Sequence, residues 1–381
     1  MNLFDVYPLF DIEPVKASGS IVWDKDGKKY LDLYGGHAVI SIGHSHPHYV
    51  KRIARQLYDI GFYSNAVQIP QQQELAEKLG KLSGYEDYNL FLCNSGAEAN
   101  ENALKVASFH TGRKKVIAFK NGFHGRTSAA VAATDNPSII APINETDNVI
   151  FLPLNDEAAF EQALQEHGAE LAAVIVEGIQ GVGGVYIPET SFLEALAVGC
   201  AKVGALLILD EVQSGYGRSG NFFAHQYANI KPDLITVAKG MGNGFPVAGV
   251  LISPDIDAKH GMLGTTFGGN YLACAASLAV LEVIEQENLV ENAQKVGDYL
   301  VEQLQKIPQV KEVRALGLMI GIELAESCAP IRKALLQEHR IFTGSSSNKN
   351  TLRLLPALCI TRKEADKFLE AFQAVLSEVA V

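Results

Sequence analysis

The sequence is poor in cysteine, and its cysteines do not form pairs. Only five occur in 381 residues, none in a CxxC spacing, and they lie far apart, at Cys93, Cys200, Cys274, Cys328 and Cys359. A disulfide-rich secreted domain or a zinc ribbon would need closely spaced pairs. We therefore expect reduced thiols in a cytoplasmic protein.

Long apolar runs and an excess of basic charge are also missing. No apolar run approaches the roughly 18 residues of a membrane span, and the first residues, MNLFDVYPLFDIEP, carry acids where a signal peptide has basic residues. The 43 acidic residues outnumber the 32 Lys and Arg, which argues against binding to nucleic acid or anionic membranes. The length, with 48% hydrophobic residues, predicts one large globular domain and a smaller one.

Nucleotide and metal fingerprints are absent too. No GK[ST] closes the turn after LFLCNSG, and GMGNGF at 240–245 lacks the GxGxxG spacing of a dinucleotide site. GHSHPH places His44, His46 and His48 at alternating positions, but no carboxylate or cysteine completes a ligand set. We predict that these histidines pack structurally and that no metal is bound.

From about residue 89 to 252, short apolar runs alternate with helical patterns. Strands are predicted at 89–93, 116–119, 149–152, 171–176, 206–210 and 234–239, with helices between some of them at 97–109, 156–166 and 191–203. This alternation is typical of an α/β fold in which helices cover a parallel sheet.

The pattern changes after TTFGGN. Helices are predicted at 271–285, 290–306, 329–339 and from 362, and strands at 318–324 and 351–355, as in a smaller α+β domain. Near the N-terminus, two strands flank the turn DKDGK and form a hairpin without a core of its own. We expect residues 1–45 to pack with a small domain of residues 285–381, and residues 46–284 to form the large domain.

Two charged features stand at the ends of predicted strands. Asp210 and Glu211 follow the apolar run 205–209. In open parallel sheets, ligands bind beyond the carboxyl ends of the strands. An acid at this point is therefore either a residue of a binding site or a helix cap. Lys239 ends another apolar strand 29 residues after Asp210. A lysine there is costly to bury unless it is paired or used covalently. Covalent attachment of a ligand is one explanation, and a simple ion pair with Asp210 is the alternative.

The segment LFLCNSGAEANENALK predicts a strand, a turn and a helix. Ser95, Gly96 and Ala97 would stand at the helix start, where free backbone N–H groups and the helix dipole bind phosphate; an ordinary serine cap is the alternative. An amine, an acid and a phosphate site together favour pyridoxal phosphate as the cofactor, because its chemistry needs all three.

The motifs in their order resemble the class III, or ornithine-type, aminotransferases, which are pyridoxal phosphate enzymes of fold type I. The resemblance spans nearly the whole chain and rests on LDLYGGHAV, GHSHP, CNSGAEANENALK, FHGRT, VEGIQGVGG, LILDEVQSGYGRSG, VAKGMGNGFP, TTFGGNYLACAA and LRLLP. Within the family, the sequence is most similar to acetylornithine and succinylornithine aminotransferases. The resemblance implies a mainly parallel sheet in the large domain and a homodimer with shared active sites.

For the cofactor, the resemblance implies covalent attachment to Lys239, which then moves a proton, and a pyridine nitrogen kept protonated by Asp210. Gln213 would contact the phenolic oxygen, and Phe123 would stack on the ring next to His124. The phosphate would be bound by Ser95, Gly96, Ala97 and Thr266 of the partner subunit.

For the substrate, the resemblance implies that Arg126 binds its carboxylate and that Arg353 binds the α-carboxylate of glutamate or 2-oxoglutarate. Glu177 would pair with Arg353 when an acylornithine is bound. The resemblance also implies that free-ornithine enzymes have an aromatic residue at the position of Gly36. The glycine would leave room for an acyl group. The alternative explanation is a turn that requires a glycine with positive φ. The implied reaction moves the δ-amino group of N-acetylornithine or N-succinylornithine to 2-oxoglutarate in arginine biosynthesis.

Other functions stay open. The first is another ω-aminotransferase, acting on free ornithine or γ-aminobutyrate. The second is a non-catalytic or dehydrogenase-like α/β binder, which the missing dinucleotide fingerprint and Lys239 disfavour.

The sequence departs from the family in two places. The family segment E-P-x-Q-G-E-G-G reads E-G-I-Q-G-V-G-G here, so that Gly178 replaces a proline and Val182 replaces an acid. Tyr271 also stands where a proline usually follows Asn270. Both changes concern the surroundings of the predicted active site.

Overall fold

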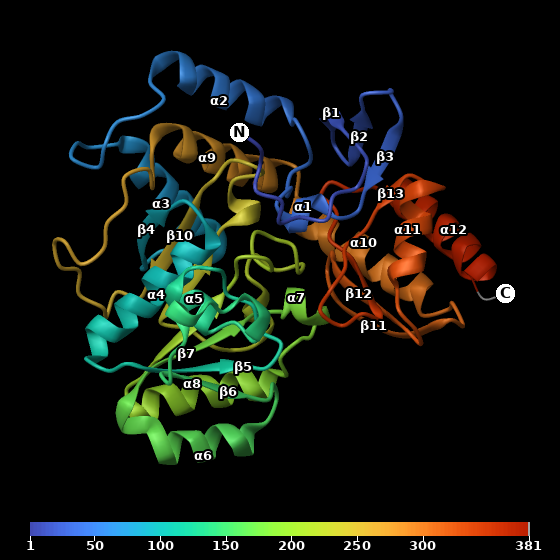
Figure 1. Cartoon of the computed structure of the whole chain (residues 1–381). Coiled ribbons are helices and arrows are strands. Elements are labelled where there is room, and N and C mark those ends of the chain that lie inside the picture. The colour runs from blue at the N-terminus through green and yellow to red at the C-terminus, as the bar shows by residue number, and fades with distance from the viewer. Residues whose placement is uncertain (380–381) are drawn as a thin grey trace.

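The computed structural model describes residues 1–379, which form three β-sheets and the helices around them (Figure 1). The largest sheet has the strand order β4-β10-β9-β8-β7-β5-β6. Its strands are β4 Asn89–Cys93, β5 Lys115–Phe119, β6 Val149–Leu152, β7 Leu171–Glu177, β8 Leu206–Asp210, β9 Leu234–Val237 and β10 Ala248–Ile252. The prediction of a mainly parallel central sheet is confirmed.

One strand departs from the parallel arrangement. The sequence predicts no strand at 248–252, but β10 forms there and pairs antiparallel with both β4 and β9. The connection explains it, because residues 238–247 contain only the 3₁₀ turn η5 Lys239–Met241. A parallel neighbour would need a crossover of a dozen or more residues.

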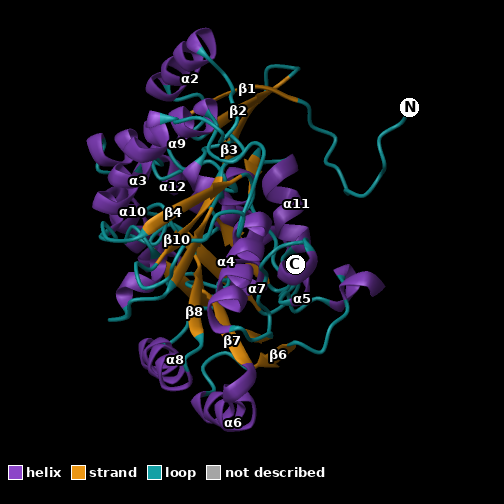
Figure 2. Ribbon diagram, turned by 90° about the vertical axis from the view of Figure 1, so that its left-hand side faces the viewer, coloured by secondary structure: helices purple, strands orange, loops and turns teal. Residues whose placement is uncertain are grey.

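Helices cover both faces of this sheet because its strands carry apolar side chains on both sides. Along β8, Leu206 and Ile208 pack on the side of α4, whereas Leu207 and Leu209 pack on the side of α6 and α8, and Figure 2 shows α4 and α8 on opposite sides of the strands. These helices and their neighbours are α2 Pro47–Asp59, α3 Pro70–Ser83, α4 Gly96–Thr111, α5 Ser128–Ala132, α6 Glu157–His167, α7 Gly181–Gly184, α8 Thr190–Val203 and α9 Tyr271–Gln286, with the 3₁₀ turns η1 Pro137–Ile139, η2 Pro142–Asn144, η3 Gly168–Glu170 and η4 Ala224–Tyr227.

A smaller antiparallel sheet lies in the C-terminal part, with the strand order β11-β12-β14. The elements of this part are β11 Val310–Leu316, β12 Met319–Leu324, β14 Thr351–Leu354, α10 Leu289–Leu304, α11 Ala329–Gln337 and α12 Arg362–Val379. They agree with the α+β pattern predicted here, except that the sequence predicts no strand at β11. Among the described residues, no helix combines the length and the apolar character needed to cross a membrane.

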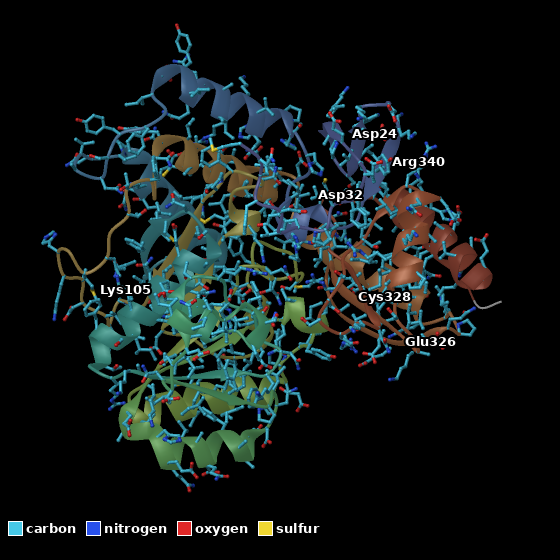
Figure 3. All side chains as sticks on the ribbon, in the orientation of Figure 1. Asp24, Asp32, Lys105, Glu326, Cys328 and Arg340 are labelled. Carbon is cyan, nitrogen blue, oxygen red and sulfur yellow. The ribbon has the colours of Figure 1, made fainter. Side chains whose placement is uncertain are left out.

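The third sheet joins the two ends of the chain. The predicted hairpin consists of β2 Ile21–Asp24 and β3 Lys29–Asp32, and β1 Pro14–Ser18 extends it on one side. On the other side, β3 pairs in parallel with β13 Ile341–Phe342, and Figure 3 shows Asp32 and Arg340 in the same region. This pairing supports the proposal that residues 1–45 pack with the C-terminal part, although the division at 45 and 284 stays a prediction.

Candidate active site

A cavity of about 410 Å³ opens where strands β4, β5, β7, β8 and β9 end. Its wall contains ten of the residues that the sequence predicts for the site, namely Ser95, Gly96, Ala97, Phe123, His124, Arg126, Glu177, Asp210, Gln213 and Lys239. Gly36, Thr266 and Arg353 lie outside its lining. The carboxyl edge of the sheet therefore brings together segments that are far apart in the sequence.

Asp210 is held by three donors at the end of β8. Its Oδ2 accepts hydrogen bonds from Nδ2 of Asn100 and from Nδ1 of His124, both at 2.8 Å, and its Oδ1 accepts one from the backbone N of Val212 at 3.0 Å. The hydrogen bond from Val212 is of the capping kind predicted from the sequence as the alternative role of Asp210. Capping alone does not require the other two donors, Asn100 and His124. Together they stabilise a negative charge at the cavity wall.

Sequence reasoning missed two residues behind this carboxylate. Asn100 donates to Asp210 and to the carbonyl of His124, and its Oδ1 accepts a hydrogen bond from Oγ1 of Thr236 at 2.7 Å. Both side chains are buried. The available signal was Thr236 itself, the one hydroxyl in the apolar run LITVA beside the strand of Asp210.

Glu211, the second carboxylate, points away from the cavity. Its two oxygens accept hydrogen bonds from the backbone N of Ala224 and His225, from Nδ1 of His225 and from Oγ of Ser214, at 2.6–3.0 Å. A Cβ at Gly178 would lie 2.6 Å from Oε1 of Glu211. The glycine that replaces the family proline thus leaves room for this anchored carboxylate.

Lys239 follows β9 within η5, and its backbone has a φ of +44°, in the left-handed region. Such backbone conformations are strained for a residue with a side chain and are common at functional sites. Burial lowers the pKa of Lys239 to about 8, against the opposing effect of Asp210. Among residues 1–379, no group accepts a hydrogen bond from its Nζ, so the simple ion pair with Asp210 is not formed.

The start of α4 forms one end of the cavity. Ser95 is the N-cap, and its side chain accepts a hydrogen bond from the backbone N of Glu98 at 3.2 Å. The serine cap is therefore present. The N–H groups of Gly96 and Ala97, in the first helical turn, have no intrahelical acceptor, and both residues line the cavity.

Glu177, the last residue of β7, lies between two backbone donors. Its Oε1 accepts a hydrogen bond from the N–H of Phe123 at 2.9 Å, and its Oε2 accepts one from Gly181 at 3.0 Å. Burial raises the pKa of Glu177 to about 7, although the charge of His124 opposes the shift. The carboxyl group therefore titrates close to neutral pH.

Arg353, on β14, lies behind the cavity wall and is 3% exposed. Its Nη1 donates to the carbonyl of Gly181 at 2.8 Å and to Oε1 of Gln213 at 3.1 Å, and its Nε donates to the carbonyl of Ser345 at 2.6 Å. In the part of the chain that the structure describes, no ion pair joins it to Glu177. The pairing was predicted only for the acylornithine complex, and it stays a prediction.

Gly36 lies in the left-handed turn α1 Gly35–Ala38, whose four residues have φ between +55° and +66°. The turn alternative is therefore realised. A Cβ at Gly36 would still meet nothing within 4 Å, so the position also has open space beside it. The turn is tied to the cavity wall because Nε2 of Gln213 donates to the carbonyl of His37.

The remaining predicted residues lie on the surface or in separate pairs. Arg126 is exposed at the cavity rim, and Thr266 is exposed in a loop outside the cavity lining. Asn270 caps α9 and Tyr271 is its first residue, so the cap persists without the family proline. His44, His46 and His48 each face a different carboxylate, in that order Asp32, Glu287 and Glu282.

Similarity to known proteins decides the family. A family model described as "Aminotransferase class-III" matches residues 5–376. The chain belongs to the class-III aminotransferases. This aminotransferase is 42% identical over 358 residues to an acetylornithine aminotransferase of Archaeoglobus fulgidus, with 93% of each chain covered. It is 41% identical to an acetylornithine aminotransferase of Bacillus subtilis, with 100% of this chain and 99% of the other covered.

A solved structure gives the same family. An ornithine aminotransferase of Toxoplasma gondii has a TM-score of 0.90 at 29% identity, and the match covers 98% of this chain and 93% of the other. Class-III aminotransferases use pyridoxal phosphate, which is therefore the cofactor of this enzyme. The cavity fits it, because an amine, a buried carboxylate and a helix N-terminus line one space of about 410 Å³.

Proposed function

We propose that this enzyme transfers the δ-amino group of N-acetylornithine, or of N-succinylornithine, to 2-oxoglutarate. The products would be an N-acylglutamate 5-semialdehyde and glutamate, in arginine biosynthesis. The relatives named acetylornithine aminotransferase, 41–42% identical over at least 93% of this chain, support this substrate. The open space beside Gly36 also fits an acyl group on the α-nitrogen.

The observation that carries the chemistry is a half-buried amine, that of Lys239, in the same cavity as the buried carboxylate of Asp210. When bound, pyridoxal phosphate supplies an aldehyde that accepts the amino group and a ring that withdraws electrons from the reacting carbon. Lys239 would bind the aldehyde and then move the proton through its Nζ; its lowered pKa leaves part of the amine neutral near pH 8. Asp210 would hold the proton on the ring nitrogen, because a nearby negative charge favours the protonated form.

Other residues would hold the cofactor in place. The N–H groups at the start of α4 would bind the phosphate, because a helix N-terminus favours an anion. Phe123 would lie against the ring, His124 would orient Asp210, and Gln213 would contact the phenolic oxygen. The phosphate contacts would come from Ser95, Gly96, Ala97 and Thr266 of the partner subunit.

For the substrates, we propose that Arg126 and Arg353 bind carboxylates. Nη2 of Arg353 has no acceptor among residues 1–379, whereas Nη1 and Nε are occupied, so Nη2 can take a carboxylate. Glu177 would pair with Arg353 when an acylornithine is bound, because the carbon that bears its δ-amino group carries no carboxylate. A pKa near 7 suits this role, because the acid can be neutral in one half-reaction and charged in the other.

We also propose a cytoplasmic homodimer with shared sites. Thr266 is exposed and lies outside the cavity lining of its own chain, which supports a role toward a second subunit. In this proposal, residues 46–284 form the large domain, and residues 1–45 and 285–381 form the small one. Sedimentation over a range of dilutions, followed by the cofactor's absorbance, checks whether dissociation releases the cofactor.

Steady-state kinetics test the substrate assignment. kcat/KM is measured for N-acetylornithine, N-succinylornithine, free ornithine and γ-aminobutyrate with 2-oxoglutarate as acceptor. We expect an acylornithine to exceed free ornithine by at least roughly tenfold, equivalent to about 1.4 kcal/mol. The second candidate is a general ω-aminotransferase, favoured by the structural similarity to an ornithine aminotransferase; equal values for acylated and free ornithine would establish it instead.

A further inference from the structure

The loop of residues 180–186 connects Glu177 to the C-terminal sheet. Two backbone hydrogen bonds between Gln180 and Tyr186, at 2.8 and 3.2 Å, close the loop at its base. On its inner side, the N–H of Gly181 donates to Glu177 and the carbonyl of Gly181 accepts from Arg353. One peptide segment therefore orients both groups that our proposed function places at the substrate carboxylate.

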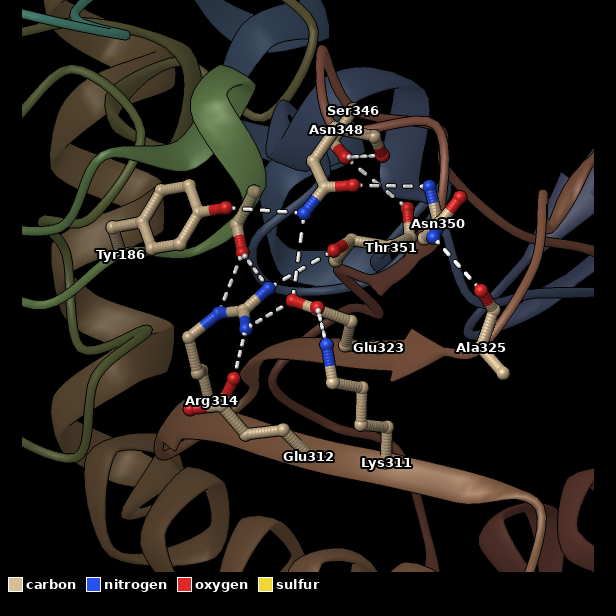
Figure 4. Close-up of polar contacts among 11 residues, drawn as sticks. Tyr186, Lys311, Glu312, Arg314, Glu323, Ala325, Ser346, Asn348, Asn350 and Thr351 are labelled. Carbon is tan, nitrogen blue, oxygen red and sulfur yellow. Dashed lines mark hydrogen bonds and ion pairs between the residues drawn. The ribbon is translucent and has the colours of Figure 1, made fainter.

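On its outer side, the loop is held by Arg314 of β11 (Figure 4). Nε and Nη2 of Arg314 both donate to the carbonyl of Gly184 at 3.1 Å. Its guanidinium also lies over the ring of Tyr186, 4.6 Å from the ring centre. Nη1 donates to Glu323 at 2.6 Å, and Nη2 donates to Thr351 at 2.9 Å. The side chain is 10% exposed, and four neighbouring residues hold it in place.

The loop needs such a restraint because its backbone is strained. Val185 is fully buried and has a φ of +59°, a conformation that is rare for a β-branched residue. Strained conformations persist only where the surrounding contacts determine them. Besides Arg314, the backbone N of Ser347 donates to the carbonyl of Val182 at 2.8 Å. Nδ2 of Asn348 also donates to the hydroxyl of Tyr186 at 3.0 Å. The planar, multidentate guanidinium of Arg314 is the contact that holds the loop at both Gly184 and Tyr186.

We propose that Arg314 is a positioning residue that holds the 180–186 loop so that Arg353 stays apart from Glu177 and open to a dicarboxylate. Without it, Gly181 would no longer be fixed between the two groups. Glu177 would lose a donor, Arg353 would lose an acceptor, and the two opposite charges would pair. That pairing competes with the α-carboxylate of 2-oxoglutarate or glutamate, but not with an acylornithine, because the carbon that bears its δ-amino group carries no carboxylate. This inference rests on the roles proposed above for Glu177 and Arg353.

The test compares Arg314→Gln with Lys311→Gln. Lys311 also contacts Glu323, at 3.3 Å, but among residues 1–379 it forms no hydrogen bond with the loop, so its substitution is a matched control for loss of a cation beside the same acid. For Arg314→Gln we expect the KM for 2-oxoglutarate to rise at least tenfold and the KM for the amino donor to change less than threefold. Lys311→Gln should leave both values unchanged. Equal changes in both KM values for Arg314→Gln would overturn the proposal, because a general loss of structure has no such preference.

Two further measurements keep the test independent of the substrate assignment. The affinity for glutarate, an unreactive dicarboxylate, is titrated through the cofactor's absorbance and should fall at least tenfold in Arg314→Gln. Amide hydrogen exchange in the peptide spanning residues 178–187 should become faster in this variant alone. An unchanged glutarate affinity overturns the role of Arg314, whereas a lack of acylornithine turnover with normal glutarate binding overturns only the proposed amino donor.

Arg314→Lys covers the case in which the glutamine variant does not fold. Lysine keeps the positive charge beside Glu323, but one ammonium group cannot reproduce the donors that converge on Gly184, Glu323 and Thr351. We expect the KM for 2-oxoglutarate to rise at least fivefold in this variant. A normal KM would show that charge alone is needed and would overturn the positioning role.

Discussion

Replacing Thr236 with valine distinguishes the effect of its hydroxyl group from the effect of its packing. Thr236 lies in the middle of β9 and is fully buried. Its Oγ1 is the donor to Oδ1 of Asn100, and Nδ2 of Asn100 in turn donates to Asp210. Valine has nearly the same shape and favours strands, so the substitution removes the hydrogen bond and little else.

The expected cost follows from the acceptor that is left behind. Oδ1 of Asn100 would be buried without a donor, which costs about 1–3 kcal/mol of stability. The amide cannot flip to avoid this, because Oδ1 would then face the carbonyl of His124 and the carboxylate of Asp210. A looser Asn100 weakens one of the three hydrogen bonds to Asp210. We assign about 1 kcal/mol to that loss, or roughly a fivefold lower kcat/KM.

Thr236→Ser is the matched variant, because it keeps the hydroxyl and removes only a buried methyl group worth about 0.8 kcal/mol. We expect the serine enzyme to keep near wild-type kcat/KM and the valine enzyme to lose about fivefold. Urea unfolding of both variants gives the stability, and steady-state transamination gives the rate. The reverse order of activity, valine above serine, would refute the reasoning and show that packing alone matters at this site.

Three further outcomes follow from the structure. Gly178→Ala should lower the free energy of unfolding by about 1–3 kcal/mol, because its Cβ would press on Glu211; an unchanged or higher urea midpoint contradicts this. Burial raises the pKa of Glu177 from 4.5 to about 7, so the wild-type free energy of unfolding falls as pH rises through that range. Between pH 5 and pH 8, Glu177→Gln should therefore gain up to about 3 kcal/mol of stability relative to wild type. Parallel curves of stability against pH for the two proteins would contradict the raised pKa. Gly36→Tyr should erode the preference for acylornithines while Gly36→Ala, which carries the same strain of about 1–2 kcal/mol at φ +56°, keeps it; an equal loss in both variants would assign the effect to the backbone.

Much of the fold was predictable because each strand of the large sheet is short, apolar on both faces and bounded by turns. The run at 206–210, for example, coincides with β8. β10 was missed as a strand, and its antiparallel direction was not predictable from periodicity, since a strand's side-chain pattern is the same in both directions. β13 was missed for a related reason: two residues, Ile341 and Phe342, form no pattern, and they become a strand only through their pairing with β3.

The candidate site was predictable where the chemistry stands at a strand end. Asp210 and Lys239 were found in this way, and the structure places both in one cavity. Asn100 and Thr236 were missed because their partners are 110 and 136 residues away along the chain. Hydrogen bonds of that sequence separation leave only a weak local trace, here one threonine in an apolar run.

The adjacent acids Asp210 and Glu211 show why a single sequence motif can hold two different roles. The strand ends between them, so that one carboxylate faces the cavity while the other turns into the loop that follows and is saturated by backbone and side-chain donors. Gly178 belongs to that second arrangement, because a Cβ there would lie 2.6 Å from Oε1 of Glu211. The departure from the family proline is therefore coupled to packing behind the site rather than to the substrate. Val182, which replaces the family acid, does line the cavity, so we expect substrate differences from other family members to arise at Val182 and not at Gly178.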